Sequence, residues 1–160
     1  MTSNFQYPFD FMIREELLFS NFVTADSNAG LLHFLQHFVS SPERFCYLRG
    51  VPGSGKTHLL QALCQHSTNA VYLPLQLLLP HGPAILEGLD GLELLVIDDL
   101  QLIAGKQEWE LELFQLFNAV HAGTGRLCVA ADQGPVGMPL TLQDLRSRLQ
   151  LCVQFEIQEL

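Results

Sequence analysis

Residues 50–57 have the composition of a loop that binds phosphate groups. The segment Gly50-Val-Pro-Gly-Ser-Gly-Lys-Thr57 fits the pattern GxxxxGK(S/T) at every fixed position. Glycines let the backbone pass close to an anion, which then meets the N–H groups at the start of the next helix. In such a loop Lys56 binds the β- and γ-phosphates of a nucleotide, and the Thr57 hydroxyl is a ligand of Mg²⁺. The alternative is a glycine-rich turn without a ligand. The residues assigned to the phosphate loop are Gly50, Pro52, Gly53, Ser54, Gly55, Lys56 and Thr57.

Two adjacent carboxylates, Asp98 and Asp99, end an apolar run that begins at Leu94. An apolar strand with acidic residues at its tip can place them in a metal site; an ordinary strand-end turn is the alternative. We predict that Asp98 holds Mg²⁺, directly or through water, and that Asp99 orients or deprotonates the attacking water. Two ionised carboxylates so close together repel each other, so a cation between them and a phosphate is favourable.

The elements that must position these residues alternate along the chain. Five short runs of consecutive apolar residues are typical of strands that are buried on both faces. Helical patterns lie at about 56–66 and 107–122, and another follows the capping residues Asp26, Ser27 and Asn28. This alternation predicts an α/β fold in which helices cover both faces of a parallel sheet. The expected strands are 45–48, 70–75, 94–97, 127–131 and 151–157.

Length and charge exclude several classes of protein. The 160 residues suffice for one domain, and 8 basic against 17 acidic residues give a net charge of −9. So few cations favour neither autonomous binding to duplex DNA nor a polybasic membrane patch. The chain lacks an apolar run of membrane-spanning length and the features of a signal peptide, so we predict a cytoplasmic protein.

Some side chains that could do chemistry have simpler interpretations. The four cysteines lie in apolar runs without a CxxC pair, which favours reduced core thiols over a metal or redox site. His33 and His37 have a spacing that can ligate metal, but the sequence offers no evident third ligand, so we assign them to an amphipathic helix. Glu108, Glu110 and Glu112 are predicted to form one solvated stretch of helix.

Six segments between about residues 19 and 149 match one known family. They are Phe19-Ser-Asn-Phe22-Val23, Gly55-Lys-Thr-His58-Leu, Ile97-Asp-Asp99-Leu-Gln, Phe117-Asn-Ala-Val-His121, Ala131-Asp132 and Asp144-Leu-Arg146-Ser-Arg148-Leu. Together they resemble the AAA+ core of the DnaA initiator family, and more narrowly its short Hda branch of DnaA inactivators.

The resemblance implies a P-loop NTPase, a three-layer sandwich around a five-stranded parallel sheet of the AAA+ type. It implies ATP or ADP with Mg²⁺ as cofactors, with Phe22 and Val23 against the adenine and His58 in the nucleotide-binding loop. Asp132 falls where the family carries its sensor 1 residue. Arg148 aligns best with the arginine finger of the box VII segment, and Arg146 could be a plain surface cation.

The same resemblance gives a domain layout. We expect an N-terminal arm at 1–24 and an AAA+ core at 25–160. The family continues beyond its fifth strand into a helical lid that supplies the sensor 2 arginine, whereas this chain stops at Leu160. The lid is therefore expected to be absent, either by truncation or naturally, which leaves open whether the chain hydrolyses ATP itself.

Two functions are compatible with these motifs. In the favoured one the chain is a regulator of DNA replication initiation that offers Arg148 to ATP bound by DnaA, with self-association as a further expectation. The alternative is an autonomous ATPase of the initiator or helicase-loader type, which uses Asp98, Asp99 and Asp132 on its own ATP.

The N-terminal segment carries a candidate partner motif. In Gln6-Tyr-Pro-Phe9-Asp-Phe11 the glutamine can form hydrogen bonds while Phe9 and Phe11 fill one hydrophobic pocket of a partner. Hda proteins carry a similar hexapeptide that docks on the replication sliding clamp, so the resemblance implies the clamp (beta subunit) as a second partner. The alternative is that these phenylalanines pack on the core.

Overall fold

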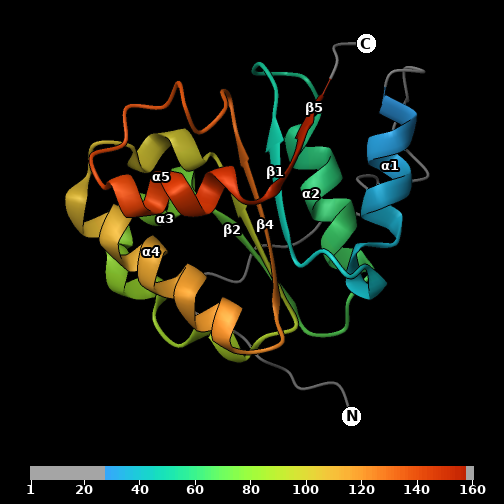
Figure 1. Cartoon of the computed structure of the whole chain (residues 1–160), viewed down its shortest axis with the longest axis horizontal. Helices are drawn as coiled ribbons and strands as arrows, with labels where there is room; N and C mark the ends of the chain where they lie inside the picture. The colour runs from blue at the N-terminus through green and yellow to red at the C-terminus, as the bar shows by residue number, and fades with distance from the viewer. Residues whose placement is uncertain (1–27, 158–160) are drawn as a thin grey trace.

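A computed structural model describes residues 28–157. Its centre is a single five-stranded sheet in the order β2-β3-β4-β1-β5, in which all paired strands are parallel (Figure 1). The α/β fold with a parallel sheet is therefore confirmed. The strands are β1 (Phe45–Arg49), β2 (Ala70–Pro74), β3 (Leu94–Asp98), β4 (Arg126–Ala131) and β5 (Val153–Glu156).

Helices cover both faces of the sheet (Figure 1). The α-helices are α1 (Ala29–Gln36), α2 (Lys56–Gln65), α3 (Leu75–Leu78), α4 (Gln107–Ala122) and α5 (Gln143–Gln150). Short 3₁₀ turns are found at Phe38–Ser40, Leu79–His81, Pro83–Leu86, Leu89–Gly91 and Leu100–Ile103. No helix within residues 28–157 is both long and apolar enough to cross a bilayer.

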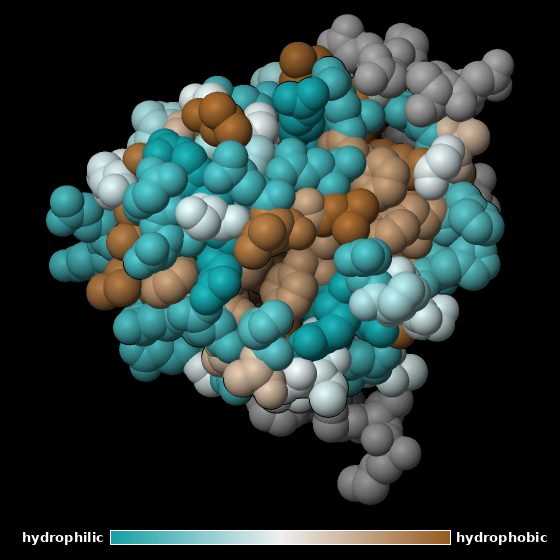
Figure 2. Space-filling view, viewed as in Figure 1, coloured by the Kyte–Doolittle hydropathy of each residue, from teal (hydrophilic) through white to brown (hydrophobic). Residues whose placement is uncertain are grey.

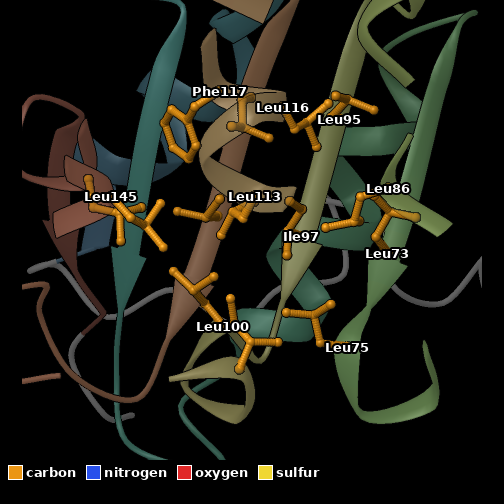
Figure 3. Packing of buried hydrophobic residues seen from close by; sticks show 14 of the residues in the cluster. Leu73, Leu75, Leu86, Leu95, Ile97, Leu100, Leu113, Leu116, Phe117 and Leu145 are labelled. Atoms are coloured by element: carbon orange, nitrogen blue, oxygen red, sulfur yellow. The ribbon is translucent and has the colours of Figure 1, made fainter. Parts of the chain in front are cut away.

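Alternate residues of the strands β1 to β4 face two separate hydrophobic cores. In β1, Cys46 and Leu48 face the core beneath α1 and α2, whereas Tyr47 faces the core beneath α3, α4 and α5. Because helices cover both faces of these strands, their sequences are continuous runs of apolar residues. Figure 3 shows the second core, where Leu113 of α4 and Leu145 of α5 lie among the strand residues.

Two predicted strand boundaries are wrong for the same reason, which is that a helix takes the end of the apolar run. Leu75 begins α3 instead of ending β2. Leu151 and Cys152 belong to the turn after α5, where their amides donate to the carbonyls of Arg148 and Leu149 at 3.1 and 3.2 Å. Consecutive apolar residues do not by themselves separate a buried strand from a buried helix end.

The cysteines lie in the two cores as free thiols, as predicted. Burial raises the pKa of the Cys64 thiol, and it raises that of Cys152 to about 12, so these two stay protonated at neutral pH. The prediction for the acidic run in α4 is wrong at Glu110, which is fully buried. Its carboxylate accepts hydrogen bonds from backbone amides that sequence patterns do not reveal.

The turn between α4 and β4 packs tightly against neighbouring backbone. Arg44 donates to the carbonyls of Val120, Gly123 and Gly125 at 2.6, 2.9 and 2.9 Å, and so caps the carboxyl end of α4. A Cβ atom at Gly125 would lie 2.8 Å from the carbonyl oxygen of Leu92. The backbone around Leu92 therefore leaves no room for a side chain at this position.

We expect Gly125→Ala to lower the free energy of unfolding by about 1–3 kcal/mol, because the new methyl group overpacks against backbone. Thermal and urea denaturation of the purified protein measure this change. Gly91→Ala is the matched control, since a Cβ there has no heavy atom within 4 Å. Equal stability of the two variants would contradict the close approach of Gly125 and Leu92.

Candidate nucleotide-binding site

The phosphate loop lies between β1 and α2, at the carboxyl edge of the sheet. Gly55 has a φ of 102°, a left-handed conformation that favours glycine, and α2 begins at the next residue. Gly50 donates its amide to the Ala131 carbonyl at 3.2 Å, and a Cβ on Gly50 would come within 2.5 Å of the Ser54 hydroxyl oxygen. The loop is therefore anchored on β4, and a side chain at Gly50 would require the Ser54 hydroxyl to rotate away.

Lys56 is buried, with 8% of its surface exposed, and its ammonium group bends back over the loop. It donates to the carbonyl oxygen of Gly50 and, at 3.1 Å, to that of Val51. Burial lowers the pKa of Lys56, while the carboxylates of Asp98, Asp132 and Asp99 act in the opposite direction. The structure thus brings the predicted lysine and the predicted acids into one electrostatic neighbourhood.

Asp98, at the end of β3, is buried and accepts three hydrogen bonds. Its Oδ2 accepts from the hydroxyls of Thr57 at 2.6 Å and Tyr72 at 2.7 Å, and its Oδ1 accepts from the amide of Asp99 at 2.9 Å. A hydroxyl and a carboxylate oxygen this close together are the donors that Mg²⁺ prefers. Thr57 and Asp98 would hold the ion, and Mg²⁺ would neutralise phosphate charge.

Tyr72 is a site residue that the sequence reasoning missed. Burial, and then the charge of Asp98, raise the pKa of its hydroxyl, so it remains a donor to Asp98. The sequence feature that could have indicated this role is a tyrosine near the carboxyl end of β2, the strand that pairs with β3.

Asp99 leaves the sheet in a left-handed conformation, with φ 62° and ψ 42°, and begins the 3₁₀ turn Leu100–Ile103. It is the non-glycine residue with positive φ in the described part of the chain. Burial and then the charge of Asp98 raise the pKa of Asp99, and a hydrogen bond from Gln101 opposes this shift.

Gln101 is a second residue that sequence reasoning missed. Its side chain forms a hydrogen bond with Asp99, and its Oε1 accepts from the amide of Asp132 at 3.3 Å. Asp132 follows the end of β4, where the family places sensor 1. The Gln101 side chain therefore bridges two predicted site residues from different strands.

Two of the remaining predicted nucleotide contacts lie in the described residues, and two lie outside them. Ser54 is buried, and His58 lies half-buried in the first turn of α2. Within the described residues the Ser54 hydroxyl oxygen has no hydrogen-bond partner. Phe22 and Val23 lie outside the described residues, so their contact with adenine stays a prediction.

Arg148 lies on the other side of the sheet from the phosphate-loop helix. Its helix, α5, packs on the core beneath α4, whereas α2 packs on the opposite core (Figure 1). Its Nε donates to Asn118 Oδ1 at 3.1 Å, and its guanidinium lies over the Phe114 ring, 5.8 Å from the centroid. Arg148 lines a pocket together with Phe45, Phe117, His121, Leu151 and Cys152.

Figure 2 shows apolar surface across the centre of this face, in the region of α5 and β5, with polar groups around it. Arg146, two residues before Arg148, has a different environment. Its guanidinium donates to the carbonyls of Pro135, Met138 and Leu140 at 3.3, 2.9 and 3.1 Å. Arg146 is therefore occupied in holding the loop between β4 and α5.

Comparison with known proteins agrees with this fold. A family model for the "Bacterial DnaA ATPAse domain" matches residues 84–156. An uncharacterized protein of Haemophilus influenzae is 38% identical over 152 residues, which cover 91% of this chain and 65% of that protein. The structure of AMPPCP-bound DnaA from Aquifex aeolicus superposes with a TM-score of 0.82 at 22% identity, over 92% of this chain and 52% of that one.

DnaI has a similar fold, with a TM-score of 0.77 at 19% identity, over 94% of this chain and 93% of that chain. This chain thus spans 65% of the length of its Haemophilus relative and about half of the DnaA chain. The five-stranded parallel sheet matches the AAA+ P-loop fold of these DnaA and DnaI structures. Residues 84–156 are in addition similar in sequence to the ATPase domain of bacterial DnaA.

We expect Lys56→Ala to weaken binding of MgATP and MgADP by about 10- to 100-fold, because a charge-assisted contact to phosphate contributes about 1.5–3 kcal/mol. Isothermal titration calorimetry measures the affinities. Lys106→Ala is the matched control, since Lys106 is an exposed lysine just before α4. The assignment of the site is wrong if both variants bind nucleotide as the parent does while keeping its melting temperature.

Proposed function

We propose that this domain binds ATP or ADP with Mg²⁺ and regulates DNA replication initiation. In this proposal it acts as the Hda branch does and promotes hydrolysis of ATP bound to DnaA through Arg148. Nucleotide binding is supported by the phosphate loop and the Thr57–Asp98 contact, and by the AMPPCP bound to a DnaA of the same fold. Bound nucleotide would act on this chain as a structural switch.

The single observation that carries the role of Arg148 is its orientation away from its own phosphate loop. Its Nε contacts Asn118, and within the described residues its two Nη groups have no hydrogen-bond partner. An arginine with two unbonded Nη groups can bind the phosphates of a nucleotide on another subunit, where it stabilises charge in the transition state.

The alternative function, an autonomous ATPase of the initiator or helicase-loader type, is favoured by a different observation. The carboxylates of Asp98, Asp99 and Asp132 all act on Lys56, and Gln101 links Asp99 to Asp132. Such a group could bind Mg²⁺ and orient water on the domain's own ATP. ATP turnover by the purified chain alone would favour this alternative, and turnover only with DnaA present would favour the regulator.

The proposal names DnaA and the replication sliding clamp as partners. Direct binding to duplex DNA or to a membrane surface is not expected from a chain with net charge −9. Self-association and a cytoplasmic location stay predictions. Gln6, Phe9 and Phe11, the predicted clamp-binding residues, lie outside the described residues.

We expect Arg148→Ala to abolish stimulation of ATP hydrolysis by DnaA, with nucleotide affinity unchanged and only a small fall in melting temperature from the lost hydrogen bond to Asn118. Arginine fingers supplied in trans accelerate hydrolysis by about 10³- to 10⁵-fold, which sets the upper limit of the loss. Phosphate release from DnaA preloaded with ATP measures the effect.

Arg146→Ala is the matched control for the finger. It should lower the melting temperature, because three carbonyl groups lose their donor, while stimulation persists below the transition. If Arg146→Ala abolishes stimulation without destabilising the protein, the finger is Arg146. If neither substitution matters, activation in trans is wrong.

We expect a peptide spanning Thr2 to Met12 to bind the sliding clamp. Burial of two phenylalanines contributes about 3–6 kcal/mol before association costs, which corresponds to micromolar affinity at best. Combined Gln6→Ala and Phe9→Ala should abolish clamp binding by the full chain in surface plasmon resonance. A sharp fall in melting temperature, with no binding by the parent peptide, would assign these residues to the core.

A further inference from the structure

Glu110 lies in the first turn of α4 and is fully buried. Its carboxylate accepts from the amide of Gly105 at 2.7 Å, from that of Thr141 at 2.9 and 3.1 Å, and from that of Leu142 at 2.8 Å. Within the described residues no cation is paired with it, so this buried acid is satisfied by backbone amides alone.

A buried carboxylate is costly unless donors surround it, and backbone amides that bond to a charged acceptor are among the stronger ones. The amino end of α5 also carries positive partial charge, which favours an anion close to it. The residue at the N-cap of α5 is Leu142, whose side chain cannot accept a hydrogen bond. Glu110 of α4 instead binds the amides of Thr141 and Leu142, the two residues directly before the first helical residue of α5.

A second polar contact joins the same two helices at the other end of α5. Arg148 donates its Nε to Asn118, which is eight residues after Glu110 and therefore about 12 Å further along α4. Between these contacts, Leu145 and Leu149 pack into the shared core. Apolar packing is not directional, so the two polar contacts determine how the short helix α5 is placed along α4.

We propose that Glu110 is a positioning residue for Arg148, because it fixes the start of the helix that carries the arginine. The effect of this placement on a partner's ATP rests on the function proposed above. Glu110 also bonds to Gly105, which follows the 3₁₀ turn that begins beside Asp99. The same carboxylate therefore joins the arginine-bearing helix to the segment that leaves the nucleotide site.

The loop before α5 is held by two charged side chains of opposite sign. Arg146 bonds to the carbonyls of Pro135, Met138 and Leu140, and Glu110 bonds to the amides of Thr141 and Leu142. The two side chains form no ion pair with each other, since each is occupied by backbone. The loop is therefore held against both α4 and α5, which restricts the positions that the start of α5 can take.

The test is Glu110→Gln in the full chain, with Glu108→Gln as the matched control. A glutamine keeps the size of the side chain, but its NH₂ group must face a backbone amide, so at least one hydrogen bond is lost. Glu108 is an exposed glutamate in the first turn of the same helix. The readout is the Nε–H resonance of Arg148, assigned by its disappearance in Arg148→Lys.

In Glu110→Gln we expect this resonance to shift and its hydrogen exchange to become about tenfold faster, because α5 loses one of its two attachments. Affinity for MgADP should stay within about twofold of the parent, since Glu110 does not contact the phosphate loop. Glu108→Gln should leave the resonance and the exchange rate unchanged. If Glu110→Gln does not fold, Glu110→Asp carries the same test, because its shorter side chain keeps the charge but cannot reach all three amides.

A lower melting temperature with an unchanged Arg148 resonance and exchange rate would overturn the proposal and leave Glu110 as a purely structural group. Stimulation of DnaA-bound ATP hydrolysis is the second readout, and it should fall in Glu110→Gln but not in Glu108→Gln. If the parent chain gives no stimulation, the proposed function fails. The Arg148 resonance still decides the role of Glu110 in that case.

Discussion

The candidate site depends on keeping one carboxylate, Asp98, in the protein interior at 1% exposure without a neighbouring cation bonded to it. A buried anion needs donors, and each donor here comes from a different element: the Thr57 hydroxyl from α2, the Tyr72 hydroxyl from β2, and the next backbone amide. The carboxyl ends of neighbouring parallel strands meet at one edge, so these donors converge there. Asp98 thus joins the phosphate loop to the sheet and turns a strand end into a site.

Local sequence patterns predicted the parts of this site that are formed by neighbouring residues. The phosphate loop and the Asp98–Asp99 pair are contiguous, and the requirements of a tight turn and a strand tip appear in their composition. The parallel sheet could be predicted because burial on both faces leaves uninterrupted apolar runs. Strand ends such as Leu75 and Leu151 could not, since a helix end uses the same residues.

The residues that were missed are single polar side chains whose partners are distant in sequence. In the sequence, Tyr72 looks like any other buried aromatic residue of a strand. Its contact with Asp98 can be predicted only when the pairing of β2 with β3 is known. Glu110 shares its spacing with Glu108 and Glu112, so the pattern reads as a solvated run. Besides the amide of Gly105, its partners are backbone amides 31 and 32 residues away, and backbone amides have no side-chain signature.

Most of the described arginines of this acidic chain are engaged in hydrogen bonds or an ion pair within the fold. Arg148 differs from them, which supports its proposed role in binding a partner's phosphate. Arg44 and Arg146 each bond to three backbone carbonyls, and Arg126 bonds to the carbonyl of Glu43. Arg49 is paired with Glu156 at 2.8 Å. In the part of the chain that the structure describes, Arg148 is the arginine that uses only its Nε and leaves both Nη groups unbonded. A guanidinium that is hydrogen-bonded only through its Nε keeps two Nη groups whose N–H donors match the geometry of a phosphate group. Within the described residues these donors have no hydrogen-bond acceptor, so they remain able to bind the phosphate of a partner.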